Sequence, residues 1–194
     1  MGTRWMAAVA AGVAAAAAVT AMVLSPAEPA AGGSWQARAV LRDAGGVRIG
    51  TVKFDGDPRS TTVKVTVDGY TAGAGTFHGL HIHANPTGGP CDPATAFANV
   101  QGHWSPSGMP HGFHEGDLPS LLVQADGSGT GQSVTDRIDP GALVGRAVVL
   151  HIGPDNLANI PPRYTAGGVA GPDSTTLATG DSGGRAACGV ITGE

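Results

Sequence analysis

Apolar and polar residues alternate with a period of two along most of the chain beyond residue 34, which is typical of strands with one buried face. The runs that carry this pattern are 35–42, 47–54, 62–67, 76–83, 121–124, 129–134, 147–152 and 186–191. Turn residues such as Asp68-Gly69 separate them, and no segment shows a convincing helical period. About eight short strands predict an all-β domain, an antiparallel barrel or sandwich.

Two stretches between the strands, 84–118 and 153–185, are too long and too rich in glycine and proline to be simple connectors. Long loops on a rigid β scaffold often carry function, so we expect the functional residues on or beside these segments. The chain shows neither an internal repeat nor an interdomain linker, which indicates a single domain.

The first 27 residues differ from the rest of the chain. An apolar run over 6–24 follows Arg4 and precedes small residues at the usual cleavage positions, 25–27. This order predicts a signal peptide over 1–27 and an exported domain over 28–194. The run is about long enough to span a bilayer, so an uncleaved membrane anchor is the alternative. In both cases we expect the domain in the extracellular space or the cell envelope.

Charged residues make up 13% of the chain, and the formal net charge is −4. A nucleic-acid-binding protein needs a basic surface to displace counterions from phosphates, so this composition argues against one. Cys91 and Cys188 are the only cysteines, 97 positions apart. In an exported domain they favour one disulfide, worth about 4 kcal/mol by loop entropy, over two free buried thiols.

Histidine is the residue type whose number and placement stand out. All seven histidines lie between His78 and His151. His81 and His83 are two positions apart on a predicted strand, so their imidazoles lie on one face, and His151 ends another strand that could supply a third. Three imidazoles with an open side suit copper. His78 lies an odd number of positions away, and we interpret it as a structural, hydrogen-bonded histidine.

A second group of potential ligands lies in the first long loop. His103, His111, His114 and Asp117 fall within 15 positions of one another. Three imidazoles and one carboxylate make the ligand set of a closed tetrahedral zinc site. Any one of these histidines alone would be interpreted as a solvated or core residue, but the two groups together predict metal binding.

Five motifs resemble those of the copper/zinc superoxide dismutases. The strand segment Phe77–His83 resembles the copper-binding signature of that family, and the segment around His103, Gly102–Pro106, is similar to the one that carries its bridging histidine. Segment 114–118 resembles the one that carries the last two zinc ligands of the family, and 148–151 resembles the one with its fourth copper ligand. Segment 184–191 resembles the C-terminal signature of the family. The motifs follow the order of the family, and the resemblance implies an eight-stranded antiparallel Greek-key barrel with two long functional loops.

The resemblance implies two metal sites that share one residue. Copper would bind His81, His83, His103 and His151. Zinc would bind His103, His111, His114 and Asp117. Asp155 would link the two sites by accepting a hydrogen bond from a ligand of each. Cys91 and Cys188 would form the disulfide.

The implied activity is the dismutation of superoxide to dioxygen and hydrogen peroxide, by a redox-cycling copper joined through His103 to a structural zinc. Arg185, in the C-terminal motif, would position the superoxide anion beside the copper through its guanidinium donors. His103 would release the copper on reduction, take up a proton and deliver it to the second superoxide.

The chain departs from the family pattern in both loops. Only two residues separate His111 from His114, fewer than family members commonly have, so a copper-only, zinc-poor dismutase is an alternative. Ala178 stands about where many members have a lysine that attracts superoxide. A non-catalytic copper-binding or copper-delivery module on the same fold is a further alternative, although the chain has no third cysteine for a delivery motif. The sequence leaves the oligomeric state open.

Overall fold

The computed structural model describes residues 1–2, 34–57 and 59–194 of the chain. The chain divides into two units, Met1–Ala31 and Gly32–Glu194, and the helices and strands described below belong to the second. Apart from its first two positions, the predicted signal peptide lies outside the described residues. None of the helices in the described part of the chain has the length and apolar character that crossing a membrane requires.

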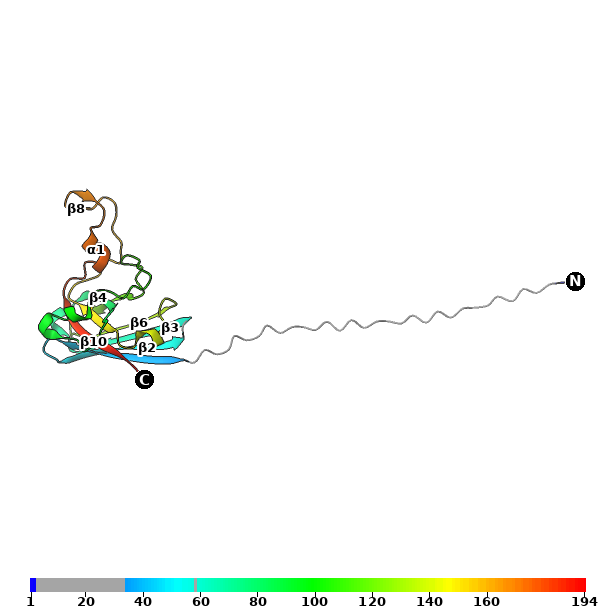
Figure 1. The fold of residues 1–194 in the computed structure, drawn as a ribbon, viewed down its shortest axis with the longest axis horizontal. Helices are drawn as coiled ribbons and strands as arrows, with labels where there is room; N and C mark the ends of the chain where they lie inside the picture. The colour runs from blue at the N-terminus through cyan, green and yellow to red at the C-terminus, as the bar shows by residue number, and fades with distance from the viewer. Residues whose placement is uncertain (3–33, 58) are drawn as a thin grey trace. The chain divides into compact units, whose positions relative to one another are not determined.

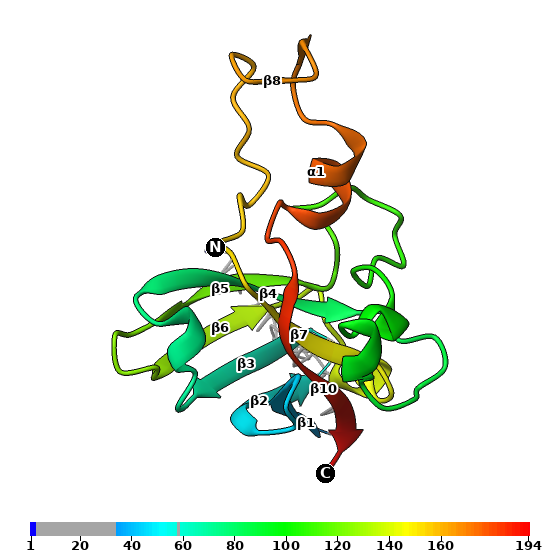
Figure 2. The same cartoon turned by 90° about the vertical axis from the view of Figure 1, so that its left-hand side faces the viewer.

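Eight strands form one antiparallel sheet that curls into a nearly closed barrel (Figure 2). They are β1 (Trp35–Asp43), β2 (Arg48–Asp57), β3 (Ser60–Val67), β4 (Thr76–His83), β5 (Asp117–Val123), β6 (Gly129–Thr135), β7 (Ala147–His151) and β10 (Arg185–Gly193). Their order across the sheet is β5-β4-β7-β10-β1-β2-β3-β6. The all-β prediction is confirmed, because each of the eight predicted runs overlaps one of these strands.

The alternation in the sequence matches the burial of the side chains where one face of a strand meets solvent. In β3, Val63 and Val65 are buried in the barrel while Lys64 between them is exposed. Strands β4 and β7 differ, because all five residues of β7 and the last six of β4 are buried. Their inner face contributes to the barrel core, and their outer face lies under the long loops, where Phe97 and Val100 pack against β7.

The connections contain short elements that the sequence pattern does not predict. Four 3-10 turns are η1 (Thr71–Gly73), η2 (Pro93–Thr95), η3 (Ala98–Val100) and η4 (Pro140–Leu143). The second long loop holds a two-residue hairpin, β8 (Thr165–Ala166) and β9 (Val169–Ala170), and one short helix, α1 (Ser174–Thr179). This loop rises from one side of the barrel (Figures 1 and 2). Six residues are too few to show a helical period, so α1 depends on its caps, Asp173 and Gly180.

A disulfide joins Cys91 in the first long loop to Cys188 on β10, with a Cα–Cα distance of 5.9 Å. The prediction of a single long-range disulfide is therefore confirmed, and the alternative of two free thiols is excluded. Because Cys91 lies in the loop and Cys188 lies on a barrel strand, the bridge holds the first long loop against the outer face of the barrel.

Candidate metal centre

Strands β4 and β7 bring three imidazoles together on the outer face of the barrel. His81 and His83 lie on one face of β4, as the spacing predicts, and both are almost completely buried. In the register of the two strands His81 pairs with Val149, so His151 two positions further lies on the same side of the sheet. The ring centroids of His81 and His151 are 4.8 Å apart, and those of His83 and His151 are 5.5 Å apart.

The first long loop returns to β4 and adds His103 to these three residues. An isolated β-bridge pairs His83 with His103, and the amide of Trp104 donates to the carbonyl of Ile82 at 2.8 Å. This pairing places the His103 ring against His81, with a centroid distance of 4.0 Å. His81, His83, His103 and His151 can each offer a ring nitrogen within 4.8 Å of the others. The four residues predicted for copper therefore converge.

The hydrogen bonds of these rings leave one nitrogen of each free for a metal. His81 donates from Nε2 to Asp155 at 2.5 Å, His83 from Nδ1 to the carbonyl of Gln101 at 2.6 Å, and His151 from Nδ1 to the carbonyl of Gly183 at 3.0 Å. The second ring nitrogen of His81, Nδ1, is buried without a hydrogen-bond partner, and so is His103 Nε2. The second ring nitrogens of His83 and His151, both Nε2, lie 3.3 Å from each other. Unpaired nitrogens facing one another are costly unless they bind a cation, so this set fits copper.

The second group is arranged around one oxygen of Asp117. Its Oδ1 lies 3.1 Å from His103 Nδ1, 3.3 Å from His111 Nδ1 and 3.1 Å from His114 Nδ1, and the Nδ1 atoms of His103 and His114 are 3.3 Å apart. Zinc bonds of about 2.0–2.1 Å in a tetrahedron place the ligand atoms about 3.3 Å from one another. His81 is also within 4.8 Å of this group, but its Nε2 is hydrogen-bonded to Asp155. His103, His111, His114 and Asp117 therefore fit zinc.

His111 and His114 both reach the second group although only two residues lie between them, because the loop folds around the carboxylate of Asp117. Its second oxygen, Oδ2, accepts hydrogen bonds from the amides of Gly112 at 2.7 Å and His114 at 3.1 Å. Gly112 has a φ of 89°, which permits the tight turn. The sequence pattern assigns Asp117 to a loop, whereas the structure places it at the start of β5, beside His81 in the register of β4 and β5.

Asp155 connects the two groups. Its Oδ2 accepts from His81 Nε2, and its Oδ1 accepts from His111 Nε2 at 2.8 Å and from the amide of Leu157 at 2.6 Å. These bonds orient one imidazole of each group and fix its tautomer. Asp155 thus accepts a hydrogen bond from one ligand of each group, as the resemblance implies.

Burial dominates the pKa of His103 and His151, whereas hydrogen bonds to carboxylates dominate that of His111. Burial lowers the pKa of His103 to about 4 and that of His151 to about 3, so both are neutral near pH 7. Burial alone would raise the pKa of Asp117, but hydrogen bonds from His103 and His111 outweigh it and hold this pKa below its usual range. For His111 burial favours the neutral form, but hydrogen bonds with Asp117 and Asp155 outweigh it and raise the pKa to about 9. Near pH 7 the metal-free protein therefore has ionised carboxylates and a protonated His111, and a metal that binds His111 displaces this proton.

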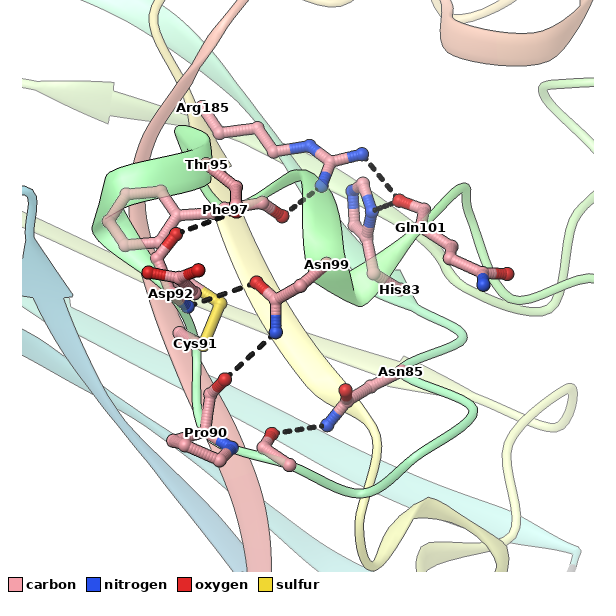
Figure 3. Close-up of a disulfide and its surroundings, with 12 residues drawn as sticks. His83, Asn85, Pro90, Cys91, Asp92, Thr95, Phe97, Asn99, Gln101 and Arg185 are labelled. Atoms are coloured by element: carbon pink, nitrogen blue, oxygen red, sulfur yellow. Dashed lines mark hydrogen bonds between the residues drawn. A yellow bond between two sulfur atoms is a disulfide. The ribbon is translucent and has the colours of Figure 1, made fainter.

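Arg185, at the start of β10, lies beside the first group. Its register partner on β7 is His151, and its guanidinium donates to the carbonyls of Phe97 and Gln101 (Figure 3). The carbonyl of Gln101 also accepts from His83, so one oxygen contacts both the arginine and a histidine. Burial and the neighbouring histidines are the larger causes of the low pKa of His83 and His151, and the positive charge of Arg185 adds to them.

Comparison with known proteins agrees with this geometry. The family model for copper/zinc superoxide dismutase (SODC) matches residues 48–191. This chain belongs to the copper/zinc superoxide dismutase family. The Cu-Zn superoxide dismutase of Mycobacterium tuberculosis is 39% identical over 160 residues, 75% of this chain and 65% of the relative. That of Deinococcus radiodurans is 34% identical over 170 residues, 79% of this chain and 82% of the relative.

The chain thus spans about 65% of the length of the mycobacterial copper/zinc superoxide dismutase. Among solved structures, the crystal structure of the clock protein EA4 has a TM-score of 0.62 with 24% sequence identity, covering 81% of this chain and 93% of that chain. At this identity the likeness concerns the fold alone.

His78 lies apart from both ligand groups of this superoxide dismutase family member. It is fully buried, with Nδ1 2.8 Å from the carbonyl of His151 and Nε2 2.7 Å from the carbonyl of Gly73. Its contacts are the structural ones that its odd spacing from His81 predicts.

Gly180 is a functional position that sequence reasoning missed. It ends α1 with a φ of 62°, and a Cβ there would collide with Nε2 of His111 and Oδ1 of Asp155. The absence of a side chain lets α1 pack against the hydrogen bond between those residues. The chain has 32 glycines, so composition gives no sign of this one. The carbonyls of Gln101 and Gly183 were also missed, because a carbonyl acceptor is independent of the side chain that its residue carries.

Proposed function

We propose that this chain dismutates superoxide to dioxygen and hydrogen peroxide, with copper held by His81, His83, His103 and His151 and zinc held by His103, His111, His114 and Asp117. The observation that carries the proposal is the position of His103. Its Nε2 faces the first ligand group without a partner, and its Nδ1 faces the second. A single imidazole that serves two groups fits a paired copper and zinc site.

Copper bound by these imidazoles supplies a centre that accepts one electron and returns one electron, which zinc cannot do. The residues of the chain supply binding and protons. Two superoxide anions and two protons give one dioxygen and one hydrogen peroxide. His103 can hold a proton at Nε2 when that atom is free of metal, while Nδ1 stays with the second group. It then delivers this proton to the second superoxide as that anion is reduced to peroxide.

Arg185 binds and orients the anion. A guanidinium has five N–H donors, and Arg185 directs one nitrogen to the carbonyl of Phe97 and another to that of Gln101, which leaves donors for superoxide. The long-range field gives little help, because the chain has a net charge of −4 and Arg163 is the one cationic residue between Gly153 and Gly184. Attraction of the anion therefore depends on charges at the site itself.

We also propose that the domain acts outside the cytoplasm. The disulfide between Cys91 and Cys188 supports this, because such bridges persist in oxidising compartments. The apolar run over 6–24 with Arg4 before it supports export as well. The relative from Brugia pahangi is an extracellular Cu-Zn superoxide dismutase, 30% identical over 163 residues.

The test is metal content followed by turnover. Elemental analysis of the purified protein should give one copper and one zinc per chain, and pulse radiolysis should show superoxide decaying in proportion to the copper. His151→Ala should lose this decay. Copper present without decay above background would overturn the proposal in favour of a non-catalytic copper-binding module, and a fully active chain without zinc would support a copper-only dismutase.

A further inference from the structure

The two carbonyls that contact Arg185 belong to residues with strained backbones. Phe97 has φ 62° and ψ 17°, and Gln101 has φ 60° and ψ −151°, in a region that is almost restricted to glycine. Neither residue is a glycine, so both conformations carry an energetic cost. Such conformations persist when the surrounding contacts leave the backbone no alternative. The contacts that hold this segment therefore determine where the two carbonyls point.

The side chain of Asn99, between these two residues, makes two of the hydrogen bonds that close the segment. Its Nδ2 donates to the carbonyl of Pro90 at 2.9 Å, and its Oδ1 accepts from the amide of Asp92 at 3.0 Å (Figure 3). Pro90 and Asp92 flank Cys91. One amide side chain thus ties the strained segment to both sides of the disulfide cysteine.

Backbone hydrogen bonds also hold the segment: the amide of Phe97 donates to the carbonyl of Asp92, and the amide of Asn85 donates to the carbonyl of Val100, both at 2.9 Å. The disulfide attaches the loop to β10 at the single residue Cys91, and the Phe97 ring packs in the small cluster under the loop. A covalent link and an apolar contact tolerate small rotations of the backbone, whereas two hydrogen bonds to one planar amide have a defined direction. Asn99 supplies the side-chain hydrogen bonds that join the segment to the residues on both sides of Cys91, and so it contributes to the orientation of the segment.

We propose that Asn99 is a positioning residue for Arg185: its amide holds the strained segment Phe97–Gln101 in the conformation that directs both carbonyls at the guanidinium. The inference rests on the proposed function, in which Arg185 binds the superoxide anion. Asn99 makes no hydrogen bond to a predicted metal ligand, although the carbonyl of Gln101 that it helps to position also accepts from His83. Loss of this amide releases the guanidinium from a single orientation.

The experiment compares Asn99→Ala with Thr61→Val. Thr61 on β3 is buried and donates to the carbonyl of Ile138 at 2.6 Å, so its variant also loses a hydrogen bond, but β1 and β2 separate β3 from β10 in the sheet. Two probes report on Arg185. Azide titration of the copper-loaded protein, followed by visible absorption, measures anion affinity, and phenylglyoxal modification of the metal-free protein, followed by peptide mass spectrometry, measures how free the guanidinium is.

Asn99→Ala should weaken azide binding about threefold to tenfold and speed modification of Arg185 by a similar factor. Thr61→Val should lower the melting temperature and change neither quantity. If Asn99→Ala lowers the melting temperature but leaves azide affinity and modification rate at wild-type values, Asn99 is only structural and the proposal is wrong. Should Asn99→Ala fail to fold, Asn99→Leu keeps the side-chain volume, removes both hydrogen bonds and is judged by the same two measurements.

A double-variant cycle separates this inference from the proposed function. In an Arg185→Ala background, Asn99→Ala should cause no further loss of azide affinity, because it acts through the arginine. A further loss as large as in the wild-type background would overturn the positioning role. If Arg185→Ala itself binds azide as well as the wild type, the failure lies in the anion-binding role given to Arg185 in the proposed function.

Discussion

Gly180 offers a direct test of how the second long loop supports the zinc-type group. Gly180→Ala places a Cβ where Nε2 of His111 and Oδ1 of Asp155 now lie, so the hydrogen bond between them has to break or move. That bond involves an ionised carboxylate and is worth about 1.5–3 kcal/mol. The left-handed backbone costs alanine a further 1–2 kcal/mol or so. The sum is about 2.5–5 kcal/mol.

Gly167 provides the matched control. It lies in the same loop with a φ of 58°, close to the 62° of Gly180, and a Cβ there would meet no atom within 4 Å. Gly167→Ala therefore carries the backbone cost of about 1–2 kcal/mol without the collision. The difference between the two variants isolates the contact with His111 and Asp155.

Urea unfolding of the metal-free variants measures the stability difference, and competition with a chromophoric chelator measures zinc affinity. Gly180→Ala should lose about 1.5–3 kcal/mol more than Gly167→Ala and bind zinc about 10- to 100-fold more weakly, as is usual when the partner of a metal-bound histidine is displaced. Equal zinc affinity in the two variants would refute the reasoning that α1 supports His111 through Gly180.

Three further predictions follow from the strained segment, the buried histidines and the charge of the second loop. Gln101→Gly should raise the unfolding free energy of the metal-free protein by about 1 kcal/mol, because glycine adopts this backbone without strain; unchanged or lower stability in urea unfolding would contradict it. The metal-free protein should be most stable near pH 6.5. It should lose stability as the pH falls toward 4 and then 3, because His103 and His151 have depressed folded pKa values of about 4 and 3 and bind protons there only on unfolding. It should also lose stability as the pH rises toward 9, because His111 has a raised folded pKa of about 9 and releases its proton on unfolding. Each can contribute up to about 1.4 kcal/mol per pH unit, and a flat profile between pH 6.5 and 4 in chemical unfolding would be inconsistent with these pKa values. Lowering the ionic strength should raise the superoxide decay rate less than in a relative with a lysine near its active-site arginine, because Arg163 is the one cationic residue between Gly153 and Gly184. A steep rise in pulse radiolysis at low salt would count against this.

The barrel could be predicted because most of its strands have one face in the core. In β3 the alternation of Val63, Lys64 and Val65 follows directly from burial. The same rule placed His81 and His83 on one face, since a strand has no freedom to do otherwise. The start of β5 was missed because its first residues come after a glycine-rich turn and lack regular alternation.

The contacts that join distant segments could not be predicted in this way. The spacing of His111 and His114 left open whether both reach one metal, and the answer depends on how Asp117 binds the amides of its own loop. The meeting of Gly180 with Asp155 depends on the path of the second long loop. Sequence periodicity reports which face of an element is buried, and it contains no information on such contacts.

The central claim is that His103 belongs to both metal groups, and calorimetric titration of His103→Ala with copper and with zinc tests it most directly. His114→Ala is the matched variant, because His114 lies only in the second group. The account predicts that His103→Ala weakens the binding of both metals, whereas His114→Ala weakens zinc and leaves copper unchanged. If His103→Ala binds either metal with wild-type affinity, the two groups do not share this residue.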